Sequence, residues 1–271
     1  MEATMKVYIF TDVEGIGGIV DWQQALPEGP DYATARLLLT EEVNAAVTGA
    51  IEGGATEVIV RDGHYMGRNF LVDKLRPGAR YYMGRSPGYV RMPEIKGSGL
   101  MLCIGYHSKV NTHGGILGHT MDGHNITAFR VNGVEMGELG MDALWAGLEG
   151  VGVGMVSGDD HLAEEAKALL GSGVETAVVK QGFAKYGGLV MSPEDSRKLI
   201  LETAMSAVKK AGKKKPKPFK IPPPYKVELD VVGQEFVEKK AAMILGAKVV
   251  GASTIVVEGD DLNYLMFAVL G

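Results

Sequence analysis

Short apolar runs rich in β-branched residues alternate with longer segments of helical periodicity, and this alternation limits the possible folds more than any other feature of the chain. The pattern predicts strands at 6–11, 56–62, 100–105, 151–158 and 175–180, and helices at 33–54, 137–148, from 160 onward and at 192–212. Asn132-Gly133, a strong turn pair between alternating residues, predicts a hairpin over 126–136. Strands interleaved with helices predict an α/β fold with a largely parallel or mixed sheet flanked by helices.

Residues 213–224, KKKPKPFKIPPP, form the one clear break in composition. Lysine and proline favour an extended, solvated linker. Only one aromatic residue, Phe219, lies among the lysines, which argues against a surface for nucleic acid or membrane. We therefore expect a core over residues 1–212, this linker, and a smaller C-terminal α/β subdomain over 225–271 that packs on the core.

Composition and charge narrow the class of protein. The net charge of −5 is unlike the basic balance of nucleic-acid-binding proteins. Cys103 is the single cysteine, so an internal disulfide is impossible and a reducing compartment fits best. The first residues lack the apolar core of an export signal, and no apolar stretch approaches the roughly 20 residues of a spanning helix. We therefore expect a cytoplasmic protein without nucleic-acid or membrane partners.

The first predicted strand ends in FTDVEGIGG, residues 10–18, which places two carboxylates before three glycines. The segment is no dinucleotide fingerprint, because the last position of Gly-x-Gly-x-x-Gly counted from Gly15 is Val20. Asp12 and Glu14 are two residues apart, so an extended chain projects them to the same side at the carboxyl end of the strand. A bound cation would neutralise this pair; an exposed acidic turn is an equally weighted alternative.

The next two strands also end in ionisable residues. Asp62-Gly63-His64 follows the strand at 56–62, and His107 follows the strand at 100–105. A lone histidine is usually structural, but three neighbouring strands that deliver carboxylates and imidazoles to one sheet edge predict a site for zinc or a similar divalent ion. Asp62 is a candidate to orient His64, and a turn residue before glycine is the equal alternative.

Further candidates follow the hairpin and its preceding loop. Glu138 lies in the first turn of a predicted helix and Glu135 on the hairpin, and the pattern does not choose between them. The long glycine-rich loop NTHGGILGHTMDGH carries three histidines, of which one or two are expected to be catalytic: His113, His119 and His124.

Two other features receive structural interpretations. Asp159 and Asp160, in SGDDH, are favoured as the N-cap of the next helix over a role in the site. Cys103 lies within an apolar strand, where a thiol is usually inert. The pattern Gly-x-Ser-x-Gly occurs once, as GRSPG at residues 84–88, but Pro87-Gly88 follow the serine in place of the helix that a nucleophile elbow requires, and the chain has no His-Glu-x-x-His helix. Covalent serine or cysteine catalysis is therefore not expected.

The motifs DVEGIGG, RDGH, GYH, GHTM, NGVEMGELG and SGDD, in this order, resemble the M55 family of metallopeptidases, the D-aminopeptidases. The resemblance extends from about Lys6 to Gln181 and implies that residues 1–212 form a metal-binding catalytic core. It implies two zinc ions per subunit, a ring-like homo-oligomer, and a catalytic histidine at His119, where GHTM stands for an SHSM-like family sequence. The ligands that it implies are Asp12, Glu14, His64, His107 and Glu138.

The resulting hypothesis is a zinc-dependent aminopeptidase that hydrolyses the N-terminal bond of short peptides or amino-acid amides, with D-residues implied by the resemblance alone. Two alternatives of other classes remain, a dinuclear-metal phosphoesterase and a non-catalytic binding protein. A phosphoesterase would need cations to clamp phosphate, for which Arg61, Arg68 and Lys109 are candidates. A non-catalytic cytoplasmic peptide-binding protein would bind peptides without turnover.

Overall fold

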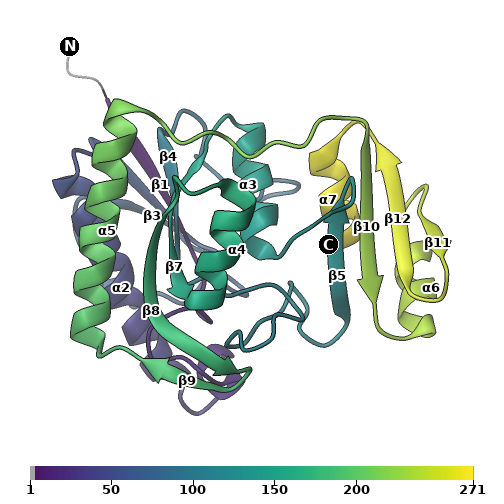
Figure 1. The fold of residues 1–271 in the computed structure, drawn as a ribbon, viewed down its shortest axis with the longest axis horizontal. Coiled ribbons are helices and arrows are strands. Elements are labelled where there is room, and N and C mark those ends of the chain that lie inside the picture. The colour runs from purple at the N-terminus through teal and green to yellow at the C-terminus, as the bar shows by residue number, and fades with distance from the viewer. Residues whose placement is uncertain (1–3, 271) are drawn as a thin grey trace.

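Two sheets of different kinds lie beside each other in the computed structural model, which describes residues 4–270 (Figure 1). The larger sheet has the strand order β3-β2-β1-β4-β7-β8-β9, and the smaller sheet has the order β11-β12-β10-β5-β6. The strands of the larger sheet are β1 (Lys6–Thr11), β2 (Glu57–Asp62), β3 (Arg80–Tyr82), β4 (Leu100–Ile104), β7 (Val153–Asp159), β8 (Glu175–Ala184) and β9 (Gly187–Val190). Those of the smaller sheet are β5 (Ile126–Val131), β6 (Val134–Glu135), β10 (Tyr225–Val231), β11 (Lys248–Val250) and β12 (Thr254–Gly259).

All strand pairs of the larger sheet are parallel except β8 with β9, and those of the smaller sheet are antiparallel, which confirms the predicted α/β class. Both faces of β1 are buried, as a parallel sheet between helical layers requires. Val7 and Ile9 belong to the core on the side of α2 and α5, whereas Tyr8 and Phe10 belong to the core shared with α3 and the smaller sheet. The helices are α1 (Trp22–Ala25), α2 (Tyr32–Glu52), α3 (Glu138–Leu148), α4 (Asp160–Leu170), α5 (Pro193–Lys213), α6 (Gln234–Ala242) and α7 (Leu262–Leu270).

Helix α5 follows its sequence signals closely and packs on α2. Ser192 caps its N-terminus by accepting a hydrogen bond from the Asp195 amide, and Pro193 occupies the first turn, where its missing N–H is harmless. The two helices approach at Gly49 of α2, where a Cβ would lie 2.2 Å from the Leu201 carbonyl oxygen. Only glycine permits this close packing.

The predicted hairpin is present but belongs to the C-terminal sheet. Its turn residues, Asn132 and Gly133, both have positive φ, at 49° and 77°, as the Asn-Gly turn requires. Strand β5 pairs with β10, and Phe129 lies opposite Leu229 in this register. Residues 126–135 of the predicted core thus form one sheet with the segment beyond 225, and the division of the chain at 213–224 stays a prediction.

The segment 213–224 crosses the top of the molecule from α5 to β10 (Figure 1). It runs directly against two glycines: a Cβ on Gly147 would lie 2.0 Å from the Phe219 carbonyl oxygen, and one on Gly152 would lie 2.4 Å from that of Pro216. The short elements α1, β3 and β9 were not predicted, because none of them has a run long enough to show periodicity. Within residues 4–270, no helix combines the length and apolar character that a membrane span needs.

Candidate metal centre

The predicted ionisable residues meet at the carboxyl edge of the larger sheet. Strand β1 pairs with β2 on one side and β4 on the other, so the strand order changes direction here, as it does at the ligand sites of open α/β sheets. The glycine after Glu14 serves close packing: the Gly15 amide donates to the Gly105 carbonyl at 2.7 Å, and a Cβ on Gly15 would lie 1.8 Å from the Tyr106 carbonyl oxygen. The glycines let the loop approach β4 and need no phosphate to explain them.

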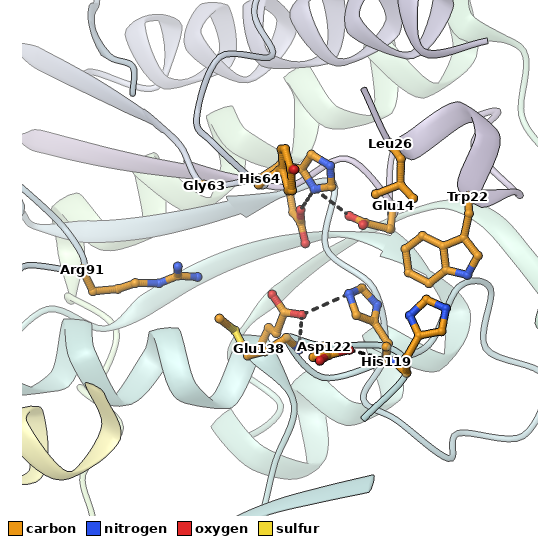
Figure 2. Close-up of a pocket in the computed structure, with 14 residues that line it drawn as sticks. Glu14, Trp22, Leu26, Gly63, His64, Arg91, His119, Asp122 and Glu138 are labelled. Atoms are coloured by element: carbon orange, nitrogen blue, oxygen red, sulfur yellow. Dashed lines mark hydrogen bonds and ion pairs between the residues drawn. The ribbon is translucent and has the colours of Figure 1, made fainter. Parts of the chain in front are cut away.

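One group of potential ligands joins the ends of β1 and β2 (Figure 2). His64 Nδ1 lies 2.9 Å from Asp12 Oδ1 and 3.2 Å from Glu14 Oε2. All three side chains are buried, and their ligand atoms lie within 4.8 Å of one another. Two carboxylates and an imidazole at this spacing form a suitable cradle for one divalent ion.

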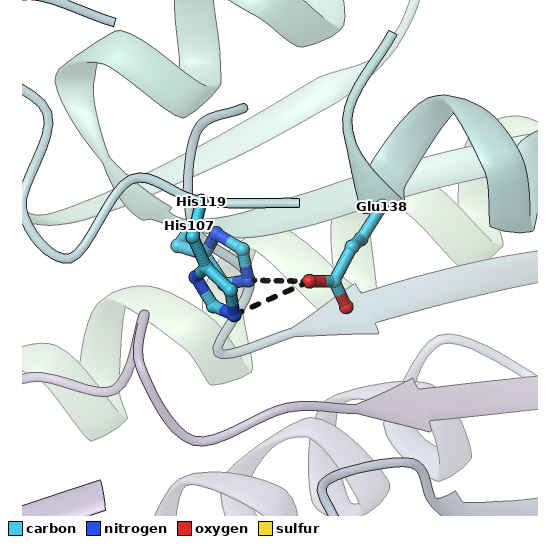
Figure 3. A group of neighbouring side chains, drawn as sticks. All are labelled: His107, His119 and Glu138. Carbon is cyan, nitrogen blue, oxygen red and sulfur yellow. Dashed lines mark ion pairs between the residues drawn. The ribbon is translucent and has the colours of Figure 1, made fainter. Parts of the chain in front are cut away.

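A second group joins the end of β4, the following loop and the first residue of α3 (Figure 3). Glu138 Oε1 lies 3.3 Å from His107 Nε2 and 3.4 Å from His119 Nε2. The two imidazoles stack with ring centroids 3.9 Å apart and an interplanar angle of 16°. The structure therefore brings Glu138 into the cluster, whereas Glu135 pairs on the surface with Lys109.

Asp12 connects the two groups. Its Oδ1 faces His64 Nδ1 at 2.9 Å, and its Oδ2 faces His107 Nε2 at 3.3 Å. One carboxylate thus presents one oxygen to each group, which is the arrangement of a carboxylate that bridges two ions.

The backbone fixes which nitrogen of each histidine faces the carboxylates. The nitrogens held by backbone carbonyls are His64 Nε2 at 2.8 Å from Ala25, His107 Nδ1 at 3.0 Å from Ser108, and His119 Nδ1 at 2.9 Å from Leu117. A carbonyl accepts only from an N–H, so a neutral ring directs the lone pair of its other nitrogen toward the carboxylates. Metal-binding histidines are commonly oriented by such a second hydrogen bond.

Lone pairs that face carboxylates require a cation or a proton between them. Glu14 Oε2 and His107 Nε2 are both buried without a hydrogen-bond partner. Ligand atoms of a tetrahedral zinc ion with bonds of about 2.0–2.1 Å lie about 3.3 Å apart, close to the 3.2 Å between His64 and Glu14 and the 3.3 Å between His107 and Glu138. The donor set and its spacing fit zinc in both groups.

The pKa shifts of the buried carboxylates and imidazoles also favour a bound cation. Burial alone would raise the pKa of Asp12, but the neighbouring imidazoles of His107 and His64 hold it well below its usual value. Burial opposes charge on His64, yet Glu14 and Asp12 raise its pKa well above the usual value. Glu138 and Asp12 do the same to the pKa of His107. The carboxylates therefore favour a positive charge at both histidines. A divalent ion supplies this charge when it displaces the proton that each ring would otherwise hold.

Two buried ionisable residues that the sequence analysis missed hold the loop that follows β1. The Lys180 ammonium donates to the carbonyls of Glu14 at 2.5 Å, Ile16 at 3.3 Å and Ile19 at 2.6 Å. Glu42 Oε1 accepts from the Gly17 amide at 3.0 Å. Neither residue carries a motif, because both act from other elements across 25 or more positions of the sequence.

The three aspartates considered beside the ligands, Asp62, Asp159 and Asp160, all accept hydrogen bonds from amide groups. The Asp62 oxygens accept from the backbone and side-chain amides of Asn69, and Asn69 in turn donates to the His64 carbonyl at 2.8 Å, so Asp62 acts on the His64 backbone through Asn69. Asp159 caps α4 by accepting from Leu162 and also accepts from Ile116, which ties the histidine loop to β7. Asp160 accepts from the Gly182 amide.

A pocket of about 370 Å³ opens over the cluster. Several of its lining residues were not anticipated, because they lie on loops or on the short helix α1 and carry no periodic signal; among them are Trp22, Tyr65, Arg91 and Asp122. Trp22 meets His119 edge to face at 4.9 Å between ring centroids. Of the two other loop histidines, His124 lines the pocket and His113 does not.

None of the predicted phosphate-clamping cations lines this pocket in the described part of the chain. Arg61 donates to the Gly84 carbonyl and the Ser86 hydroxyl away from the cluster. Lys109 pairs with Glu135 on the surface, and Arg68 is exposed. The lining carboxylates are Asp12, Glu14, Asp122 and Glu138.

Comparisons with known proteins identify the family of this chain. The model of the peptidase M55 family, described as D-aminopeptidase, matches residues 5–270 and so extends the similarity beyond Gln181. The D-aminopeptidase of Bacillus subtilis (strain 168) is 31% identical over 264 residues, which cover 95% of this chain and 93% of that protein. The solved structure of the Zn-dependent D-aminopeptidase DppA from Bacillus subtilis, described as a self-compartmentalizing protease, matches with a TM-score of 0.91 and 31% identity over 98% of this chain and 96% of that one.

Proposed function

The chain belongs to the M55 family of metallopeptidases, and from this premise we propose that it is a zinc-dependent D-aminopeptidase with two ions per subunit. Its substrates would be short peptides or amino-acid amides from which it removes the N-terminal residue. The single observation that carries the two-ion proposal is the position of Asp12, whose two oxygens face His64 and His107 separately.

The proposed division of ligands follows the two groups. Glu14 and His64 would hold one ion, His107 and Glu138 would hold the other, and Asp12 would bridge them. When bound, a pair of such ions lowers the pKa of a water ligand toward neutrality and polarises a carbonyl oxygen. The three carboxylates balance much of the charge of the pair, and the buried rings of His64 and His107 keep the ligand atoms in place.

His119 is the proposed acid–base residue. Its Nδ1–H is held by the Leu117 carbonyl, so Nε2 is the nitrogen that accepts or returns a proton. Burial and the neighbouring charge of His107 lower its pKa, which keeps the ring neutral near pH 7 and able to act as a base. Trp22 packs edge-on against the ring and restricts its rotation.

The surroundings of the cluster support exopeptidase action. The carboxylates that line the pocket, together with the metal pair, offer partners for the free α-amine of a peptide, and the volume of about 370 Å³ suits a short one. The preference for D-residues is supported by the description of the family and by the names of the two Bacillus subtilis matches.

The proposal includes a homo-oligomer that encloses the sites, as the description of the DppA structure suggests. Large apolar side chains exposed on the β8–β9 hairpin are compatible with subunit contacts: Phe183, Tyr186, Leu189 and Val190. We further propose a cytoplasmic location, with which the single buried cysteine agrees.

A substrate screen of the zinc-loaded protein tests the proposal. D-aminoacyl amides and D,D-dipeptides should be cleaved at least tenfold better than their L-counterparts, and zinc analysis should give two ions per chain. A chromogenic phosphate ester serves as the control substrate and should not be turned over. Tight peptide binding without hydrolysis in zinc or cobalt would contradict the enzymatic proposal, and hydrolysis of the phosphate ester alone would replace it with a phosphoesterase.

A further inference from the structure

Arg91 reaches the pocket from the segment between β3 and β4, and its guanidinium is held rigidly (Figure 2). Its Nε and Nη2 donate to the two carboxylate oxygens of Asp142 at 2.7 and 3.1 Å. Asp142 is almost fully buried and also accepts from the Tyr106 hydroxyl at 2.7 Å. The guanidinium carbon lies 4.9 Å from the Phe10 ring centroid. These contacts leave the guanidinium in a single position.

One edge of this guanidinium is left for a ligand. A guanidinium carries five N–H groups, and the bonds to Asp142 use one on Nε and one on Nη2. Nη1 has no hydrogen-bond partner among residues 4–270, and 19% of the side-chain surface is exposed. Arg91 lines this pocket and also a second one beside Trp145, and in Figure 2 its guanidinium is directed toward Glu138. Arg91 is thus prepared to donate to a group that enters the pocket.

Charge selects the kind of group that Arg91 would bind. Apart from it, no lysine or arginine of the described chain lines the pocket, which four carboxylates otherwise make acidic. An anionic group away from the metals would therefore find its favourable partner at Arg91. Planar carboxylates match the guanidinium geometry best.

We propose that Arg91 binds the C-terminal carboxylate of the substrate. This inference rests on the proposed aminopeptidase function and deepens it. In Figure 2, Arg91 lies on one side of the ligand carboxylates and the Trp22–His119 pair on the other. A substrate whose scissile bond lies over the cluster thus extends its far end toward Arg91, and the pocket volume suits two residues.

The test compares D-alanyl-D-alanine with D-alanyl-D-alaninamide, which share the scissile bond and differ in the terminal charge. For the wild-type protein, kcat/KM should favour the free acid by about 10- to 100-fold, the contribution of a charge-assisted hydrogen bond. In Arg91→Met the ratio should fall to near one, mainly through a higher KM for the acid. Both substrates are measured on one preparation, so the folded fraction and the metal content cancel in the ratio.

Two further variants distinguish loss of carboxylate binding from a general disturbance of the structure. Arg91→Lys keeps the charge beside Asp142 but loses the planar donors, and its ratio should be intermediate. The control Arg68→Met removes an exposed arginine outside the pocket and should keep the wild-type ratio. If Arg91→Met does not fold, comparison of the acid-to-amide ratio between the wild-type protein and Arg91→Lys still tests the role of Arg91.

The outcomes also distinguish this inference from the function on which it rests. Equal cleavage of acid and amide by the wild-type protein would overturn the role of Arg91 and leave the aminopeptidase function standing. An unchanged preference in folded Arg91→Met or in Arg91→Lys would overturn it as well. Cleavage of neither substrate, nor of any D-aminoacyl amide, in zinc would overturn both.

Discussion

The two halves of the candidate metal centre are built in different ways. Asp12 and Glu14 are two positions apart at the end of one strand, and His64 follows the adjacent strand, whose register with β1 is fixed through Thr11 and Asp62. The other half combines His107 after β4, His119 from a long loop, and Glu138 at the start of α3. The first half is a product of the sheet, whereas the second depends on how a loop and a helix pack against it.

Their supports differ as well. Lys180 and Glu42, both buried, hold the loop of the first half through backbone carbonyls and an amide. In the second half the imidazoles of His107 and His119 stack on each other and are held by carbonyls only one or two residues away. The first half is thus supported from distant elements, whereas the second is supported by ring stacking and by carbonyls that are its own neighbours in the sequence.

The largest effect is expected at the residue that belongs to both halves. Asp12→Asn removes the charge that faces His64 and His107, so binding of both ions should weaken and kcat/KM should fall by at least about 1,000-fold. Metal analysis by mass spectrometry after dialysis checks the expected loss. The surface substitution Glu135→Gln is the control and should retain two ions. Two retained ions in Asp12→Asn would contradict the bridging role.

Single substitutions of one histidine in either half should show whether the two halves bind their ions independently. His64→Ala and His107→Ala are each expected to retain about one ion of two, because each ring faces carboxylates of a single group besides Asp12. Zinc titration by calorimetry should then show one weakened site in each variant. Loss of both ions in each variant would show that the halves form a single cooperative unit.

His119→Ala tests whether the second half contains a proton-transferring residue in addition to ligands. Turnover should fall by about 10²- to 10⁴-fold while both ions are retained, since an acid–base residue contributes about this much. His113→Ala, a loop histidine outside the pocket, should behave as the wild type. Loss of one ion in His119→Ala would instead make it a ligand of the group with His107 and Glu138.

The smallest effect is expected at Glu42, which supports the loop of the first half, and it should appear in the free energy of unfolding. Burial raises the pKa of Glu42 to about 7, although the Gly17 amide and Ser196 hydroxyl act in the opposite direction. Between its ordinary pKa of 4.5 and about 7, the folded protein holds a proton that the unfolded chain has released. This stabilising contribution is complete below 4.5 and is lost as the pH rises through 7.

In the wild-type protein this titration should lower the free energy of unfolding by up to about 3 kcal/mol between pH 4.5 and 8. Glutamine does not titrate, so Glu42→Gln should lose this part of the pH dependence. Urea unfolding at a series of pH values measures the difference. The neighbouring Glu41, which pairs with Arg197 at the surface, supplies the control, and Glu41→Gln should leave the pH dependence nearly unchanged. An identical pH dependence in Glu42→Gln and the wild type would show that Glu42 does not titrate in this range.

The sequence by itself determined the α/β class and the long elements, because strong periodicity and caps such as Ser192-Pro193 act locally. It also determined the first half of the centre, since ligands at the ends of adjacent strands are brought together by pairing alone. The resemblance selected Glu138 over Glu135, a choice that the pattern of the hairpin left open.

Only the tertiary structure decided the remaining features. It placed the hairpin at 126–135 in the C-terminal sheet, because β5 pairs with β10 from nearly 100 residues away. It also brought Lys180 beneath the first loop and Arg91 into the pocket. These residues act across long sequence separations, and the pairings that place them depend on packing of the whole chain, which local periodicity does not encode.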